Sequence, residues 1–182
     1  MQIYDLLKQD HEEVKALLTE LVNLAEDDDY HSVLIDQIAS ALIPHSRAEE
    51  SVFYNTIRAV DSDTVEVMHG YKEHIEAEGI LRTLQALDKT DMSWKATAVK
   101  LKEALDHHVV EEESKIFAQG HRIFTAEEAE SIGEAFVELK GKIVLQGGLA
   151  NTFELVKNLM PPRLINKLSN FSASGRSGSA GV

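Results

Sequence analysis

Four histidines lie at positions where the helical pattern of the chain calls for apolar side chains. Leucine or valine lies three, four or seven positions from each of them, as Leu7 and Val14 do around His11. Residues at these spacings share one face of an α-helix, so all four imidazoles should point into the interior. A single inward histidine is usually only a hydrogen-bonded core residue. The four are His11, His45, His74 and His108.

Two of these histidines are followed by a glutamate one helical turn later. His45 precedes Glu49 and His108 precedes Glu112, each at the i, i+4 spacing. Side chains at this spacing are neighbours, about 5–6 Å apart at Cβ, which suits chelation of one ion or bridging of two. A lone His-x-x-x-Glu unit is more often a surface pair, so the metal interpretation depends on the whole set of six residues.

Burying four imidazoles and two carboxylates is costly unless a positive charge neutralises them. The inward stripes contain no Lys or Arg, and a metal ion would supply the missing charge. Mixed nitrogen and oxygen ligands suit iron, manganese or zinc rather than calcium or magnesium. One zinc ion needs only four ligands, so six ligands indicate two ions.

The elements that must position these residues are long helices, because the chain has few prolines and glycines before residue 140. Intervals of 34, 29 and 34 residues separate the four histidines, which is about one helix plus one turn. We therefore predict an all-α, up-down-up-down four-helix bundle with an additional C-terminal helix or helices. The predicted bundle helices span about 3–25, 31–60 with a kink near 40–44, 63–87, and 91 or 93 to 119.

The predicted domain boundaries follow from these helices. Residues 1–120 should form the bundle, 121–171 a C-terminal helical appendage and 172–182 a disordered tail. Thr125 and Glu128 form a capping box that should start the appendage, and Asp63 with Glu66 forms a similar pair before the third helix. Further apolar stretches run over 149–160 and 164–171.

Composition limits the partners and the compartment. The formal net charge of -13 argues against binding nucleic acid. The absence of cysteine excludes disulfides, thiolate metal sites and cysteine nucleophiles. The N-terminus lacks the features of a signal peptide, and no apolar run reaches the roughly 20 residues of a membrane helix. We expect a cytoplasmic protein that does not bind membranes.

Four segments of the chain resemble the motifs of the hemerythrin-like, HHE cation-binding domain. They are 8–11, 45–54, 73–74 and 108–117. The resemblance covers roughly residues 1 to 120, extends more weakly to about 145, and is greatest to the actinobacterial variants. It implies a four-helix bundle around two iron ions joined by an oxo or hydroxo bridge. It also implies that the four inward histidines are terminal ligands and that Glu49 and Glu112 bridge the ions.

One departure from the family pattern concerns the third helix. Oxygen-carrying hemerythrins have His-x-x-x-His there, whereas this chain has His74 followed by Glu78. Glu78 is therefore a candidate oxygen ligand, the alternative being a solvated carboxylate. Tyr54 is a second candidate, as a ligand or a pocket-lining phenol, if a local helical bulge turns it inward. Tyr71 could hydrogen-bond to the centre.

A second register is open on the fourth helix, because His107 and Glu111 have the same spacing as His108 and Glu112. The buried stripe of Leu101 and Leu105 favours His108.

The expected function is that of a non-haem di-iron protein reacting with peroxide or dioxygen, either catalase-like or redox-protective. One alternative is sensing or storage of oxygen, nitric oxide or iron. Another is a helical interaction module whose metal is structural. The small-molecule partners would be hydrogen peroxide, dioxygen or nitric oxide.

Overall fold

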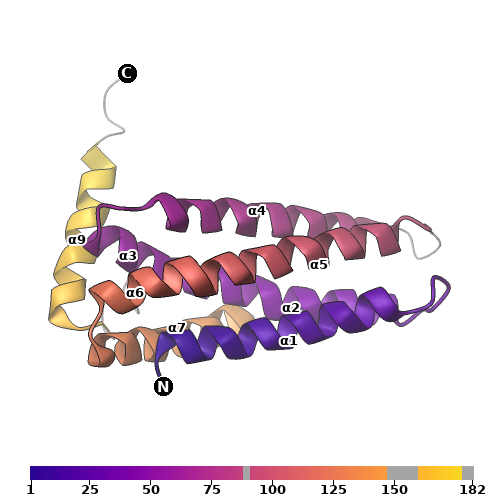
Figure 1. The fold of residues 1–182 in the computed structure, drawn as a ribbon, viewed down its shortest axis with the longest axis horizontal. Helices are drawn as coiled ribbons and strands as arrows, with labels where there is room; N and C mark the ends of the chain where they lie inside the picture. The colour runs from indigo at the N-terminus through magenta and orange to yellow at the C-terminus, as the bar shows by residue number, and fades with distance from the viewer. Residues whose placement is uncertain (88–90, 147–159, 178–182) are drawn as a thin grey trace.

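The computed structural model describes residues 1–87, 91–146 and 160–177, and these residues contain helices and no strand. Figure 1 shows long helices lying lengthwise beside one another. The predicted up-down-up-down bundle is confirmed. Its helices are α1 (Ile3–Asn23), α2 (His31–Glu49), α4 (Val65–Ala86) and α5 (Trp94–Glu111).

The second and fourth helices each pass through one π-helical turn. The first turn, η1 (Glu50–Tyr54), leads into α3 (Asn55–Val60). The second, η2 (Glu112–Ile116), leads into α6 (Phe117–Ile123). In the second predicted helix, the regular α-helix thus ends at Glu49. At the expected kink near 40–44, α2 continues as α-helix through Pro44.

The expected cap of the third helix is wrong. This helix begins at Val65 after Thr64, whose side chain makes no cap hydrogen bond. The Asp63 carboxylate accepts from the Val65 amide at 3.4 Å, but the Asp63 amide donates to Asp61 Oδ1 at 3.1 Å rather than to Glu66. The Glu66 carboxylate instead lies 3.4 Å from the Lys115 ammonium. The Glu66 side chain, which a capping box would use, therefore forms an ion pair with the neighbouring helix instead.

The interior of the bundle is divided into two apolar clusters. One cluster includes Leu7 and Ile116, and the other includes Val14 and Leu105. On α1, His11 lies between Leu7 and Val14, so it falls at the boundary between the clusters. His11 therefore marks a layer of the interior that has packed apolar side chains on both sides.

Toward the C-terminus, the described residues form α7 (Ala126–Gln146) and α9 (Pro162–Ser177). In Figure 1, α7 runs beside α1 and α2 and α9 crosses the end of the bundle. The predicted capping box is confirmed: the Glu128 amide donates to Thr125 Oγ1 at 3.2 Å, and the Thr125 amide donates to Glu128 Oε2 at 3.0 Å. The Arg163 guanidinium also binds Glu128, which ties α9 to the start of α7.

The predicted additional C-terminal helices are confirmed. Side chains of α7 and α9, such as Phe136 and Leu164, share an apolar cluster with α1. The stretch 149–160 lies outside the described residues except for Met160. Helix α9 extends to Ser177, although we expected disorder from Ser172.

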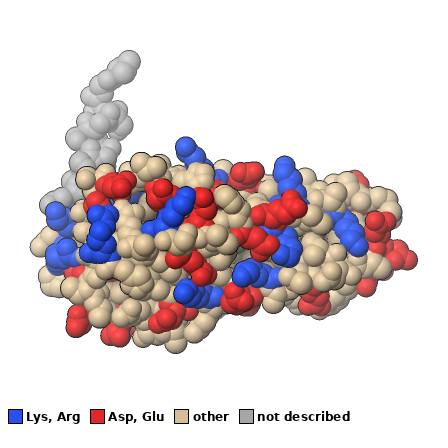
Figure 2. Space-filling model, viewed as in Figure 1, with Lys and Arg blue, Asp and Glu red and all other residues tan. Residues whose placement is uncertain are grey.

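The surface carries charges of both signs. On the face drawn in Figure 2, acidic and basic side chains are interspersed rather than separated. None of the described helices combines the length and the apolar character that crossing a membrane requires.

Candidate metal centre

The six residues predicted to bind metal come together in the middle of the bundle. Each is 4% exposed or less. Their backbones belong to α1, α2, α4, α5 and the first residue of η2. They are His11, His45, Glu49, His74, His108 and Glu112. The layer between the two apolar clusters therefore consists of ligand-type side chains.

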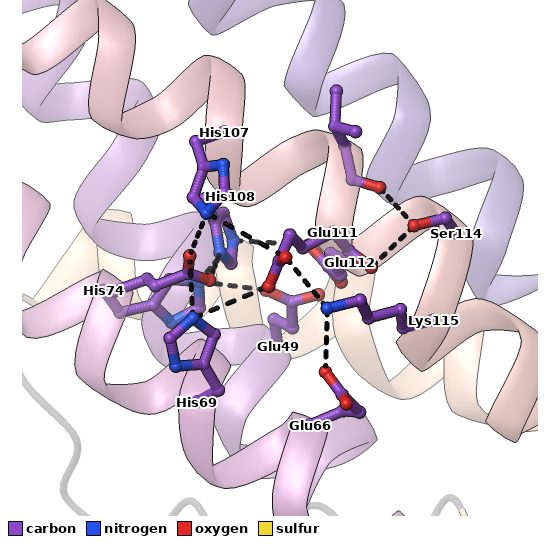
Figure 3. A network of polar contacts seen from close by, with 12 residues as sticks. Glu49, Glu66, His69, His74, His107, His108, Glu111, Glu112, Ser114 and Lys115 are labelled. Atoms are coloured by element: carbon purple, nitrogen blue, oxygen red, sulfur yellow. Dashed lines mark hydrogen bonds and ion pairs between the residues drawn. The ribbon is translucent and has the colours of Figure 1, made fainter.

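Each buried carboxylate faces imidazoles from two helices. Glu49 Oε2 lies 3.4 Å from His74 Nε2 and 3.7 Å from His45 Nε2. Glu112 Oε2 lies 3.3 Å from His11 Nε2 and 3.4 Å from His108 Nε2. Figure 3 shows Glu49 and Glu112 next to His74 and His108.

All four imidazoles are held from behind by a carboxylate. Because an ionised carboxylate can only accept, each Nδ1 carries the hydrogen and each neutral ring presents an Nε2 lone pair to the centre. The Nε2 atoms of His74 and His108 are 3.0 Å apart. The Nδ1–carboxylate pairs are His11–Glu113 at 2.9 Å, His45–Asp10 at 3.0 Å, His74–Glu50 at 3.0 Å and His108–Glu73 at 2.9 Å.

These four supporting carboxylates were missed at the level of sequence, although the signal is present. Each is adjacent in the chain to one of the six central residues, as Asp10 is to His11 and Glu113 to Glu112. The pattern also repeats at an offset of 63 positions, so that His11 corresponds to His74 and Glu49 to Glu112. The two halves of the bundle thus contribute equivalent sets of ligands.

The buried donors fit a cation. His11 Nε2 and all four carboxylate oxygens of Glu49 and Glu112 are buried without a hydrogen-bond partner. Burial and the nearby charge of Glu112 raise the pKa of Glu49 well above its ordinary value. No lysine or arginine is buried among the described residues. A transition-metal ion with nitrogen and oxygen ligands would satisfy these atoms.

The imidazoles of the centre differ in their affinity for protons. Burial lowers the pKa of His45 to about 4. Burial acts on His108 in the same sense, but hydrogen bonds with Glu112 and Glu73 outweigh it and raise that pKa to about 9. The site therefore attracts protons at His108, where metal and proton would compete.

Comparison with known proteins agrees with this geometry. The sequence model of the hemerythrin HHE cation-binding domain matches residues 2–119. The chain belongs to this family. A crystal structure of a hemerythrin HHE cation-binding domain-containing protein from Mycobacterium kansasii has the same fold, with a TM-score of 0.68 and 21% identity over 86% of this chain and 98% of that one.

A further relative is a protein of Nostoc sp. named as a DNA nickase. It is 30% identical over 145 residues, which are 79% of this chain. The match covers 40% of the nickase, so this hemerythrin HHE domain spans about two fifths of that protein's length.

Tyr54 lies inside the hemerythrin HHE domain, next to the centre. Its side chain is fully buried, and its ring stacks on His74 with centroids 5.5 Å apart and planes at 9°. The π-turn η1 accounts for this position, because i to i+5 pairing brings residue 54 round toward the face of Glu49. Burial raises the pKa of Tyr54 well above its usual value, and its hydroxyl has no hydrogen-bond partner.

Tyr71 and Glu78, the other two candidates, lie farther out. The Tyr71 hydroxyl donates to Asn55 Oδ1 at 3.0 Å and to the Glu50 carbonyl at 3.2 Å. Its ring packs edge-on against Tyr54, so it supports that residue rather than reaching the six donors. The expectation that Glu78 replaces the missing histidine does not match its position. Its carboxylate is paired with Arg47 and Arg82, which neutralise it away from the centre.

The remaining histidines lie outside the centre. The His107 side chain is 63% exposed, whereas His108 is buried. His69 and His121 are exposed. His31 is buried, with its ring stacked on Trp94.

A small cavity adjoins the centre. Its volume is about 10 Å³, and apolar side chains including Val14, Leu42 and Leu105 line it together with all four inward histidines. A cavity of this size holds roughly one water molecule. The cavity therefore has room for a molecule of only a few atoms.

The register of α5 leads to the first prediction. His108→Gln should lose bound metal and thermal stability together, because the change removes a donor whose Nδ1 is also held by Glu73. His107→Gln should keep most of the metal at the buried centre and most of the thermal stability. Metal analysis and thermal melting of the two variants check this; the opposite ranking would mean that the inward face of α5 is assigned one residue off.

Proposed function

We propose that the chain is a non-haem di-iron protein that reacts with hydrogen peroxide or dioxygen. The observation that carries the proposal is the set of four carboxylate-held imidazoles facing Glu49 and Glu112 in a buried layer. Two ions are favoured over one because the halves of the bundle supply equivalent ligands at the 63-residue offset. Glu49 and Glu112 would hold the ions together with the four imidazoles.

Iron suits the donor set, and the cavity suits a small reacting molecule. Imidazole and carboxylate ligands suit iron among the first-row metals. Two bound irons would supply a two-electron couple, which peroxide decomposition requires without an organic cofactor. The apolar cavity limits the reacting molecule to the size of peroxide, dioxygen or nitric oxide.

The protein's own groups would control protons and geometry. The Nδ1 contacts fix the orientation of each imidazole, and such contacts raise the basicity of the ligand. The Tyr54 hydroxyl holds a proton beside the centre, because burial keeps its pKa high. Packed side chains on both sides of the layer exclude bulk water.

We propose no nucleic-acid partner for this chain, although one relative is named as a DNA nickase. Because the net charge is -13, a phosphate backbone would be repelled. The mixed charges of the face in Figure 2 offer no continuous basic surface.

The test is peroxide consumption by the iron-loaded protein. We expect peroxide to disappear faster than with the same concentration of free iron, with half a mole of dioxygen released per mole consumed. We also expect no stable oxygenated form on cycling between air and argon. A rate no faster than that of free iron would contradict the proposal, and reversible oxygenation would favour oxygen storage or sensing instead.

A further inference from the structure

A second group of metal-ligand side chains lies on the surface beside the buried centre. Helix α4 supplies His69 and Glu73, and α5 supplies His107 and Glu111, each pair at the i, i+4 spacing. Figure 3 shows the labelled members of this group, His69, His107 and Glu111, turned toward one another. One ligand atom from each of the four residues lies within 4.8 Å of the others.

The spacing of these donor atoms fits a tetrahedral ion. Ligand atoms about 2.0–2.2 Å from a tetrahedral zinc ion are roughly 3.4 Å from one another. His69 Nε2 lies 3.4 Å from Glu73 Oε1 and 3.5 Å from Glu111 Oε2. His107 Nε2 lies 3.7 Å from Glu73 Oε1 and 3.9 Å from Glu111 Oε1. Small side-chain rotations would bring all four donors to ligand distance.

Among the described residues, Lys115 is the only lysine that contacts the group. It leaves ligand atoms of the group available. The Lys115 ammonium lies 2.8 Å from Glu111 Oε1 and 3.4 Å from Glu66. Glu111 Oε2 faces His69 on the other side. The imidazoles of His69 and His107 are 49% and 63% exposed, so an ion can reach them from solvent.

We propose that His69, Glu73, His107 and Glu111 bind one divalent transition-metal ion of the zinc type. This site lies beside the buried centre, takes its own ion, and does not depend on which metal that centre holds. The two sites share Glu73, whose Oε2 accepts from His108 Nδ1 at 2.9 Å while its Oε1 faces the surface imidazoles. An ion at the surface is thus one carboxylate and one imidazole away from the buried metals.

The experiment is zinc uptake by the chain whose buried centre is already loaded with iron. After equilibrium dialysis against Zn²⁺, both metals are counted in the same sample. We expect one zinc per chain with the iron count unchanged. The double variant His69→Gln/His107→Gln should lose this zinc and keep its iron. The matched control, His121→Gln, replaces another exposed histidine and should keep both.

Three results would overturn the proposal: no zinc taken up by the unaltered protein, zinc entering only as iron leaves, or equal uptake by the double variant. The single variants His69→Gln and His107→Gln, each expected to weaken zinc binding, provide the same comparison should the double variant fold poorly. Because iron is counted separately, loss of the buried centre is distinguished from loss of the surface site.

Discussion

Glu112→Gln should lose most of the bound metal, whereas Glu78→Gln should retain it. The Glu112 carboxylate lies 3.3 Å and 3.4 Å from the Nε2 atoms of two imidazoles, and both of its oxygens are buried without a hydrogen-bond partner. Gln preserves the shape but removes the negative charge. Changing only the groups that support metal ligands typically costs about 10–100-fold in affinity, so we expect at least that loss here.

The control is matched, because Glu78 is also a glutamate inside a bundle helix but its charge is met by Arg47 and Arg82. Thermal melting with and without a chelator provides a second measurement. Bound metal stabilises the folded state by mass action, so the unaltered protein and Glu78→Gln should both melt at a lower temperature after chelation. For Glu112→Gln this difference should nearly vanish. Full metal content in Glu112→Gln would show that Glu112 is not a ligand.

Helical periodicity was enough to predict the bundle and to select the six central residues. Leu101 and Leu105 define the buried face of α5, and both are almost fully buried. His108 falls on that face, one turn after Leu105, because side chains three or four residues apart point the same way. The same reasoning distinguishes His108 from His107 without any structure.

What periodicity could not supply depends on contacts between distant parts of the chain. The π-turn η1 shifts the register after Glu49, and a local sequence pattern gives no reliable sign of such a turn. Glu78 pairs with Arg82 on its own helix and with Arg47 on α2, which is 31 residues away in the chain. The support of His45 by Asp10 extends to Lys140 on α7, whose ammonium lies 2.6 Å from the Asp10 carboxylate.

Two glycines of helix α4 should respond in opposite ways to replacement by alanine. Gly79→Ala should stabilise the protein by about 1 kcal/mol, because glycine is a poor helix former and a Cβ at this position meets nothing within 4 Å. At Gly70 the same change would place a Cβ 2.7 Å from the Tyr54 hydroxyl oxygen and 3.0 Å from two carbons of its ring. We therefore expect Gly70→Ala to destabilise the protein by about 1–3 kcal/mol, the usual cost of overpacking a core.

Gly70→Ala should also disturb the buried centre, since the Tyr54 ring that it displaces is stacked on His74. Thermal melting gives the two stabilities, and the visible spectrum of the metal-loaded protein reports on the centre. Gly79→Ala, on the same helix, should leave that spectrum unchanged. Adding Tyr54→Phe to Gly70→Ala should recover part of the lost stability, because it removes the atom closest to the new methyl group. If Gly70→Ala were as stabilising as Gly79→Ala, Tyr54 could not occupy the buried position against α4 in which its ring stacks on His74.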